Sequence, residues 1–178
     1  MVVSPRCFSG RRPYIGAMRT LSIVGRSGSG KTTLLVRLIP QLIRVGVRVA
    51  ALKHSHHGRI EVDRPGKDSF RLREAGAEAV MLLSQGQLVQ IETLREQPSI
   101  EQIESRLRGI DLLLVESWKS ASLPSLEVIG ESGDRIDPVG CGERLALVSD
   151  LDPGGSLPRF RRDDVEELAR FVRDWMGK

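Results

Sequence analysis

The residues best suited to chemistry form a glycine-rich stretch near the start of the chain. They match the pattern G-x-x-x-x-G-K-[ST] and one following threonine: Gly25, Arg26, Ser27, Gly28, Ser29, Gly30, Lys31, Thr32 and Thr33. Apolar residues precede the stretch and helical spacing follows it, which is the setting of a phosphate-binding P-loop. The pattern predicts that backbone N–H groups cradle the phosphates of a nucleoside triphosphate. Lys31 would reach the β- and γ-phosphates, and the Thr32 hydroxyl would coordinate Mg²⁺.

A carboxylate for the same metal ion is predicted at the end of a later strand. Residues 112–115 are four consecutive apolar residues, and Glu116 follows them directly. The ends of parallel strands face the ligand crevice of an α/β sheet, so Glu116 is expected beside Thr32. Two roles stay open for Glu116, as a metal ligand through water or as the group that orients the attacking water.

The three histidines of the chain lie together at positions 54, 56 and 57, in a polar loop. Imidazole suits zinc or nickel, so a transition-metal site is one interpretation of this loop. Asp63 follows in the same loop, where its carboxylate is predicted to lie in the outer coordination shell of the magnesium ion and to take part in catalysis. Asp68 or Ser69 would cap the next helix or take part in catalysis.

Recognition of the base requires a polar group at the end of a late strand. Asp150 follows the apolar residues 145–148 and Ser149. A carboxylate at this position could accept hydrogen bonds from N1 and N2 of guanine, whereas adenine offers no matching pair of donors. Asp150 is therefore the predicted base reader.

Short apolar runs alternate with helical patterns along the chain, which predicts an α/β fold with a mostly parallel sheet. Taken with the P-loop, this indicates a three-layer P-loop NTPase with helices flanking the sheet. The predicted strands are 21–24, 47–52, 79–83, 88–91, 111–115, 126–129 and 145–148. The predicted helices are 31–45, 67–74, 100–107 and 163–176. Pro40 lies inside the first helix and is expected to bend it.

Length and composition predict one domain over residues 18–178, preceded by a flexible basic leader of residues 1–17. Arg6, Arg11 and Arg12 lie in this leader without an acidic residue, and they account for most of the net charge of +4. The remaining chain is nearly neutral and only 4% of all residues are aromatic, which argues against nucleic-acid binding. No apolar run is long enough for a membrane span. With only two cysteines, a reducing cytoplasm is the expected location.

Several of these segments together resemble the molybdopterin-guanine dinucleotide biosynthesis adapter protein B (MobB) family. The resemblance rests on the P-loop, on K-H-x-H-H and D-x-P-G-K-D-S within residues 53–69, on residues 75–77, and on residues 111–119. It implies a GTP- and Mg²⁺-binding protein with weak GTPase activity, often a homodimer. Such a protein assists the guanylyltransferase that attaches GMP to molybdopterin. Family members commonly carry glycine after the strand-end glutamate, whereas this chain has Ser117.

Two other functions stay open at this point. A small-molecule kinase on the same scaffold would use Asp63 or Glu116 as its base. A metallochaperone-type GTPase would use His54, His56 and His57 as metal ligands. Transfer of phosphate to a metabolite distinguishes the first, and stoichiometric binding of a transition metal distinguishes the second.

Overall fold

The computed structural model describes residues 17–55, 63–118, 121–136 and 142–177. The chain divides into two compact units. One unit comprises Met1–His54 and Glu104–Lys178, and the other comprises Ser55–Ile103. The P-loop and Glu116 belong to the first unit, whereas Asp63 belongs to the second.

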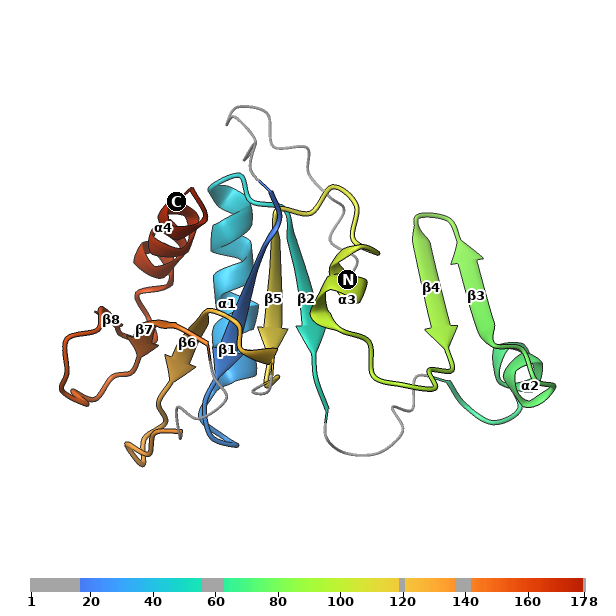
Figure 1. Ribbon diagram of the computed structural model, residues 1–178, viewed down its shortest axis with the longest axis horizontal. Helices are drawn as coiled ribbons and strands as arrows, with labels where there is room; N and C mark the ends of the chain where they lie inside the picture. Colours follow the sequence, from blue (N-terminus) through green and yellow to red (C-terminus); the bar gives the residue numbers. More distant parts are fainter. Residues whose placement is uncertain (1–16, 56–62, 119–120, 137–141, 178) are drawn as a thin grey trace. The chain divides into compact units, whose positions relative to one another are not determined.

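The first unit is built on a six-stranded sheet with the order β2-β5-β1-β6-β7-β8 (Figure 1). Its strands are β1 (Arg19–Val24), β2 (Val49–Lys53), β5 (Leu112–Glu116), β6 (Ser125–Val128), β7 (Arg144–Val148) and β8 (Arg159–Phe160). Every pairing between neighbouring strands is parallel. The carboxyl ends of all these strands therefore meet along one edge, with β1 near the middle of that edge.

Two helices, α1 (Lys31–Arg44) and α4 (Val165–Met176), pack against this sheet and against each other. The apolar residues of α4 recur every three or four positions, and all of them are buried, as the sequence predicted: Val165, Leu168, Ala169, Val172 and Met176. Helix α1 continues through Pro40 to Arg44. The P-loop NTPase fold with a parallel sheet flanked by helices is thus confirmed.

Most element bounds differ from the predicted ones by one or two residues, and three differences have a clear cause or consequence. The strand predicted over 47–52 begins at Val49, because the N–H of Val47 closes α1 by bonding to Leu42 O and that of Arg48 bonds to Asp111. The helix predicted over 100–107 is the single short helix α3 (Ile100–Glu104). Strand β8 was not predicted, since two residues are too few to show a period.

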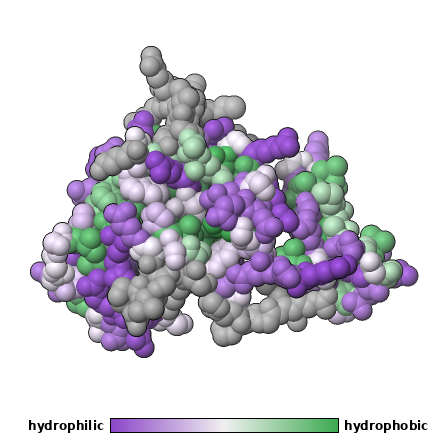
Figure 2. All heavy atoms as spheres, viewed as in Figure 1, coloured by the Kyte–Doolittle hydropathy of each residue, from purple (hydrophilic) through white to green (hydrophobic). Residues whose placement is uncertain are grey.

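The second unit contains α2 (Asp68–Glu74) and an antiparallel hairpin of β3 (Ala79–Ser84) and β4 (Gln87–Glu92). Both strands and their pairing were predicted. Large apolar side chains of this hairpin are exposed, and green spheres mark them in Figure 2. The exposed ones are Met81, Leu82, Leu83 and Leu88. No helix within the described residues is long and apolar enough to cross a membrane.

Candidate functional site

The P-loop connects the end of β1 to the start of α1 and lies against the end of β6. At Gly25 the backbones come very close, because a Cβ there would stand 2.3 Å from Val128 O and 2.7 Å from Ser29 Oγ. Gly30 precedes α1 with φ of 92°, a left-handed conformation that glycine adopts without strain. The two glycines let the chain leave the sheet, curl, and enter the helix within a few residues.

Lys31 places a positive charge inside this curled loop. Its side chain is buried, and Nζ donates hydrogen bonds to Gly25 O at 3.1 Å and to Arg26 O at 2.6 Å. Lys31 is also the first residue of α1, so the helix N-terminus and the ammonium group point their positive charge at the same place. The donors of this loop are suited to an anion such as a polyphosphate.

The strand-end carboxylate meets the loop hydroxyl as the sequence predicted. Thr32 Oγ1 donates a hydrogen bond of 2.8 Å to Glu116 Oε1. Glu116 is only 7% exposed, and Lys53 Nζ lies 3.9 Å from the same carboxylate oxygen. A hydroxyl and a carboxylate are hard oxygen ligands of the kind that Mg²⁺ prefers.

Lys53 was not among the predicted site residues, although it lies in the histidine motif. It reaches Glu116 because β2 and β5 are paired in parallel with these two residues directly opposite each other. Strand register of this kind is a long-range property that the spacing of residues along the chain does not encode.

Ser117, the departure from the family pattern, has a φ of 71°. This is the left-handed region, where an L-residue with a Cβ is strained and glycine is not. The chain therefore makes the turn after Glu116 with a residue that is less suited to it than glycine. Its N–H still bonds to Ile23 O at 3.2 Å, which keeps the turn attached to β1.

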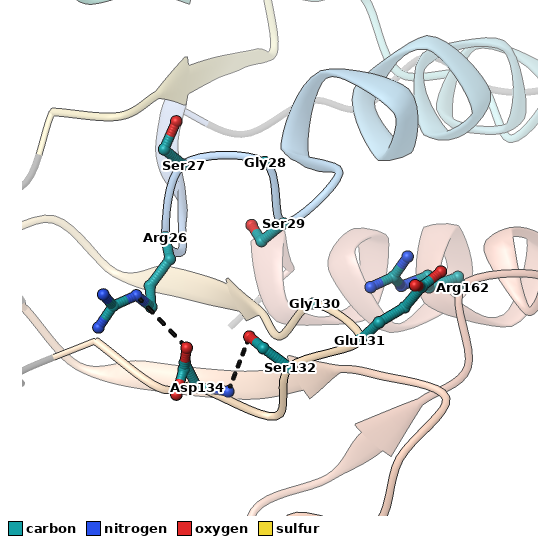
Figure 3. A pocket seen from close by; sticks show the side chains of 9 residues that line it. All are labelled: Arg26, Ser27, Gly28, Ser29, Gly130, Glu131, Ser132, Asp134 and Arg162. Atoms are coloured by element: carbon teal, nitrogen blue, oxygen red, sulfur yellow. Dashed lines mark hydrogen bonds and ion pairs between the residues drawn. The ribbon is translucent and has the colours of Figure 1, made fainter.

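A pocket of about 320 Å³ opens beside the P-loop, on the β6 side of β1, whereas Glu116 lies on the β5 side (Figure 3). It lies between residues 26–29 of the P-loop, residues 130–132 and Asp134 after β6, and Arg162. Arg26 Nε and Asp134 Oδ2 approach to 3.8 Å across it, as the dashed line in the figure shows. The pocket mixes carboxylates, hydroxyls and guanidinium groups, so its chemistry suits a polar ligand.

Thr33 and Asp150 lie on this same side of β1. Thr33 lines a smaller cavity of about 90 Å³ together with Gly30 and Arg162. Asp150 follows β7 and is exposed, and its Oδ1 accepts the backbone N–H of Arg162 at 3.1 Å. The structure thus brings Asp150 to the P-loop edge of the sheet, and Arg162 is, after Lys53, a second residue that the sequence analysis missed.

Asp63 has a defined environment within the second unit. Its Oδ1 accepts hydrogen bonds from Ser69 Oγ at 2.9 Å and from the N–H of Arg64 at 3.0 Å. Its Oδ2 lies 3.7 Å from Arg73 Nε, and both side chains are largely buried. These contacts tie Asp63 to helix α2, so Asp63 stabilises the start of that helix. Its catalytic role stays a prediction.

Of the three histidines, His56 and His57 lie outside the described residues. The ring of His54 stacks on Trp118, with centroids 5.0 Å apart and planes 10° from parallel. Its backbone N–H bonds to Glu116 O at 3.0 Å, which extends the pairing of β2 and β5. Across the described ranges, no group of three or more His, Cys, Asp or Glu side chains is arranged to hold a metal ion.

Comparison with known proteins decides the family. The model of the family "Molybdopterin guanine dinucleotide synthesis protein B" matches residues 20–150. The chain belongs to the MobB family. This confirms the resemblance found in the sequence.

Individual MobB relatives agree with this assignment over nearly the full chain. The molybdopterin-guanine dinucleotide biosynthesis adapter protein of Escherichia coli K12 is 36% identical over 167 residues, covering 89% of this chain and 93% of the relative. The adapter protein of Haemophilus influenzae is 41% identical over 160 residues, covering 88% of each. A crystal structure of molybdopterin-guanine biosynthesis protein B superposes with a TM-score of 0.74 at 31% identity, covering 89% of this chain and 99% of that one.

Proposed function

We propose that this MobB-family chain binds GTP with Mg²⁺ at its P-loop and acts as an adapter in molybdopterin guanine dinucleotide biosynthesis. In this role it assists the guanylyltransferase that attaches GMP to molybdopterin, in the cytoplasm. The relatives of Escherichia coli and Haemophilus influenzae, both named as adapter proteins of this biosynthesis, support the proposal. Any hydrolysis of GTP by the chain itself is slow and accessory.

The contact between Thr32 Oγ1 and Glu116 Oε1 is the observation that carries the nucleotide part of the proposal. These two oxygens come from different elements, and a metal ion between a loop hydroxyl and a strand-end carboxylate would also reach the β- and γ-phosphates. The Mg²⁺ would neutralise phosphate charge, while Lys31 binds the same phosphates directly. Because Glu116 is engaged by Thr32 and Lys53, it serves the metal side of the site, which fits a low rate of hydrolysis.

Equilibrium titration with GTP and with ATP, each with and without Mg²⁺, tests this proposal. We expect a preference for GTP and tighter binding with Mg²⁺. Lys31→Ala removes a charged hydrogen bond to phosphate, a loss of about 1.5–3 kcal/mol, and the Kd for GTP should rise accordingly. Arg44→Ala, which removes an exposed positive charge at the opposite end of α1 from Lys31, is the control and should bind like the parent protein.

The alternative outcomes of this titration are informative. A preference for ATP would contradict the adapter proposal and favour a small-molecule kinase. Transfer of phosphate from ATP to an added metabolite would then confirm the kinase. Equal binding by Lys31→Ala and the parent protein would show that the P-loop does not hold the phosphates. Where GTP binding is found, the next measurement is the affinity of the GTP-loaded protein for a guanylyltransferase.

We further propose that the chain forms a homodimer through the hairpin of its second unit. Two-stranded hairpins are marginally stable alone in water, yet β3 and β4 expose several large apolar side chains, including Leu83 at 83%. A second copy of the same hairpin offers the apolar surface needed to cover them. Light scattering should give a dimer mass for the parent protein and a monomer mass for Leu83→Glu. Gln85→Glu adds a charge beside it at an exposed polar position and should remain dimeric.

A further inference from the structure

We propose that Arg162 binds the phosphate chain of the nucleotide at its nucleoside end, and that Asp150 positions Arg162 instead of reading the base. This inference rests on the proposed function, because it assigns residues to the same nucleotide. Arg162 lies between β8 and α4, beyond the residues that the family model matches. Nothing in its local sequence distinguishes it from the neighbouring Arg161.

The side chain of Arg162 is held in place by contacts on two sides. Its Nη2 donates a hydrogen bond of 3.0 Å to Ile129 O, at the end of β6. Its Nε lies 3.6 Å from Asp150 Oδ2, and its backbone N–H donates to Asp150 Oδ1 at 3.1 Å. A guanidinium fixed in this way loses little side-chain entropy on binding a ligand.

These contacts leave the guanidinium beside the P-loop. Its Nη1 lies 3.8 Å from the position that a Cβ on Gly30 would take. Arg162 lines both the pocket next to residues 26–29 and the cavity next to Thr33. In Figure 3 its side chain extends from the loop before α4 toward the P-loop.

The order of the sheet indicates which phosphate Arg162 would contact. Glu116 ends β5 on one side of β1, whereas Ile129 and Asp150 follow β6 and β7 on the other side. Lys31 and the metal site at Glu116 take the β- and γ-phosphates. The α-phosphate and the nucleoside then lie toward Arg162. A guanidinium is well suited to this position, since it binds phosphate oxygens with two parallel hydrogen bonds.

Asp150 acts on the nucleotide through Arg162 in this arrangement. Both of its carboxylate oxygens face atoms of Arg162, one the backbone N–H and the other Nε. A base reader needs these same oxygens for N1 and N2 of guanine. The existing pair is already charge-complementary and partly shielded from water, so Asp150 is a positioning residue.

Titration of Arg162→Ala with GTP, GDP and GMP is the first test. We expect the Kd to rise by about tenfold for each nucleotide, a change equivalent to about 1.4 kcal/mol, because all three carry the α-phosphate. Arg161→Ala is the matched control: it removes the same charge one residue earlier, from an exposed side chain, and should bind like the parent protein. Arg162→Lys should fall between, since lysine keeps the charge but not the paired hydrogen bonds.

The second test separates positioning from base reading. Asp150→Asn should weaken GTP and ITP by the same factor, and combining it with Arg162→Ala should add little further loss. A selective loss of GTP over ITP in Asp150→Asn would show that the carboxylate reads the 2-amino group, which overturns the inference. Equal binding by Arg162→Ala and Arg161→Ala, with the parent protein binding GTP normally, would overturn the inference alone. Failure of the parent protein to bind any guanine nucleotide would overturn the proposed function and this inference with it.

Discussion

The close approach of the P-loop to β6 makes Gly25 and Gly28 an informative pair for mutation to alanine. A new Cβ at Gly28 meets no atom within 4 Å, so the only cost of Gly28→Ala is backbone strain at a positive φ of 76°. That strain destabilises the folded protein by about 1–2 kcal/mol. Alanine also lowers the conformational entropy of the unfolded chain, which stabilises the folded protein by about 0.4–1 kcal/mol. The net loss of stability should be about 0.5–1 kcal/mol.

Gly25→Ala should cost considerably more. Its Cβ would overlap Val128 O, and Val128 is a core residue with 1% exposure. The P-loop must therefore move away from β6 or the strand must shift, and overpacking of a core costs about 1–3 kcal/mol. Added to backbone strain like that at Gly28, the total is about 2–4 kcal/mol. The two substitutions add the same methyl group, so their difference reports mainly the contact with Val128 O of β6, together with a closer approach to the rotatable hydroxyl of Ser29.

Denaturation in urea measures this difference directly. Trp118 and Trp175 are the two tryptophans of the chain, and their fluorescence can follow unfolding of the first unit. The midpoint of Gly25→Ala should lie well below that of Gly28→Ala at similar slopes. Equal stabilities within 0.5 kcal/mol would refute the reasoning, because they would show that the loop does not press against β6.

Three further predictions follow from single contacts. Ser117→Gly should raise stability by about 0.5–1 kcal/mol, because it removes left-handed strain at φ 71°; a lower denaturation midpoint would contradict this. Burial alone raises the pKa of Asp111, but hydrogen bonds and charge from Arg48 outweigh it and hold the pKa below its ordinary value. The stability that this pair contributes is present above about pH 4 and is lost as the pH falls through the lowered pKa of Asp111. Arg48→Met removes that contribution, so acid unfolding, followed by circular dichroism, should begin at a higher pH than in the parent protein. Thr32→Val removes the hydroxyl next to Glu116, so GTP affinity should fall in Mg²⁺ and stay unchanged in its absence; an equal loss in both would contradict a metal role.

The parts of the site that were predicted from the sequence are those built from consecutive residues. Residues 25–33 carry their own turn-forming glycines and the start of a helix, so local spacing was sufficient to recognise the loop. Glu116 was likewise found, because a buried parallel strand appears as an apolar run and its end must face the ligand edge. The contact with Thr32 then follows from the pairing of β5 with β1.

The parts that were not predicted depend on contacts between distant segments. Lys53 reaches Glu116 only through the register of β2 on β5. Arg162 follows the two-residue strand β8, which shows no period, and it stands in a run of arginines whose members look alike in the sequence. Asp150 was recognised as a strand-end carboxylate, but its partner Arg162 lies twelve positions later in the sequence, after strand β8. Side-chain partners of this kind become visible only when the strand order is known.

The position of Arg162 also links the C-terminal segment to the P-loop. Helix α4 packs on α1, the helix that begins at Lys31. Asp163, the residue after Arg162, forms an ion pair of 2.8 Å with Arg37 of α1. The segment that carries Arg162 is therefore held by the same helix that begins with Lys31. A nucleotide that contacts both Lys31 and Arg162 would connect the two ends of the first unit, so its binding should protect α4 from unfolding as well as the loop.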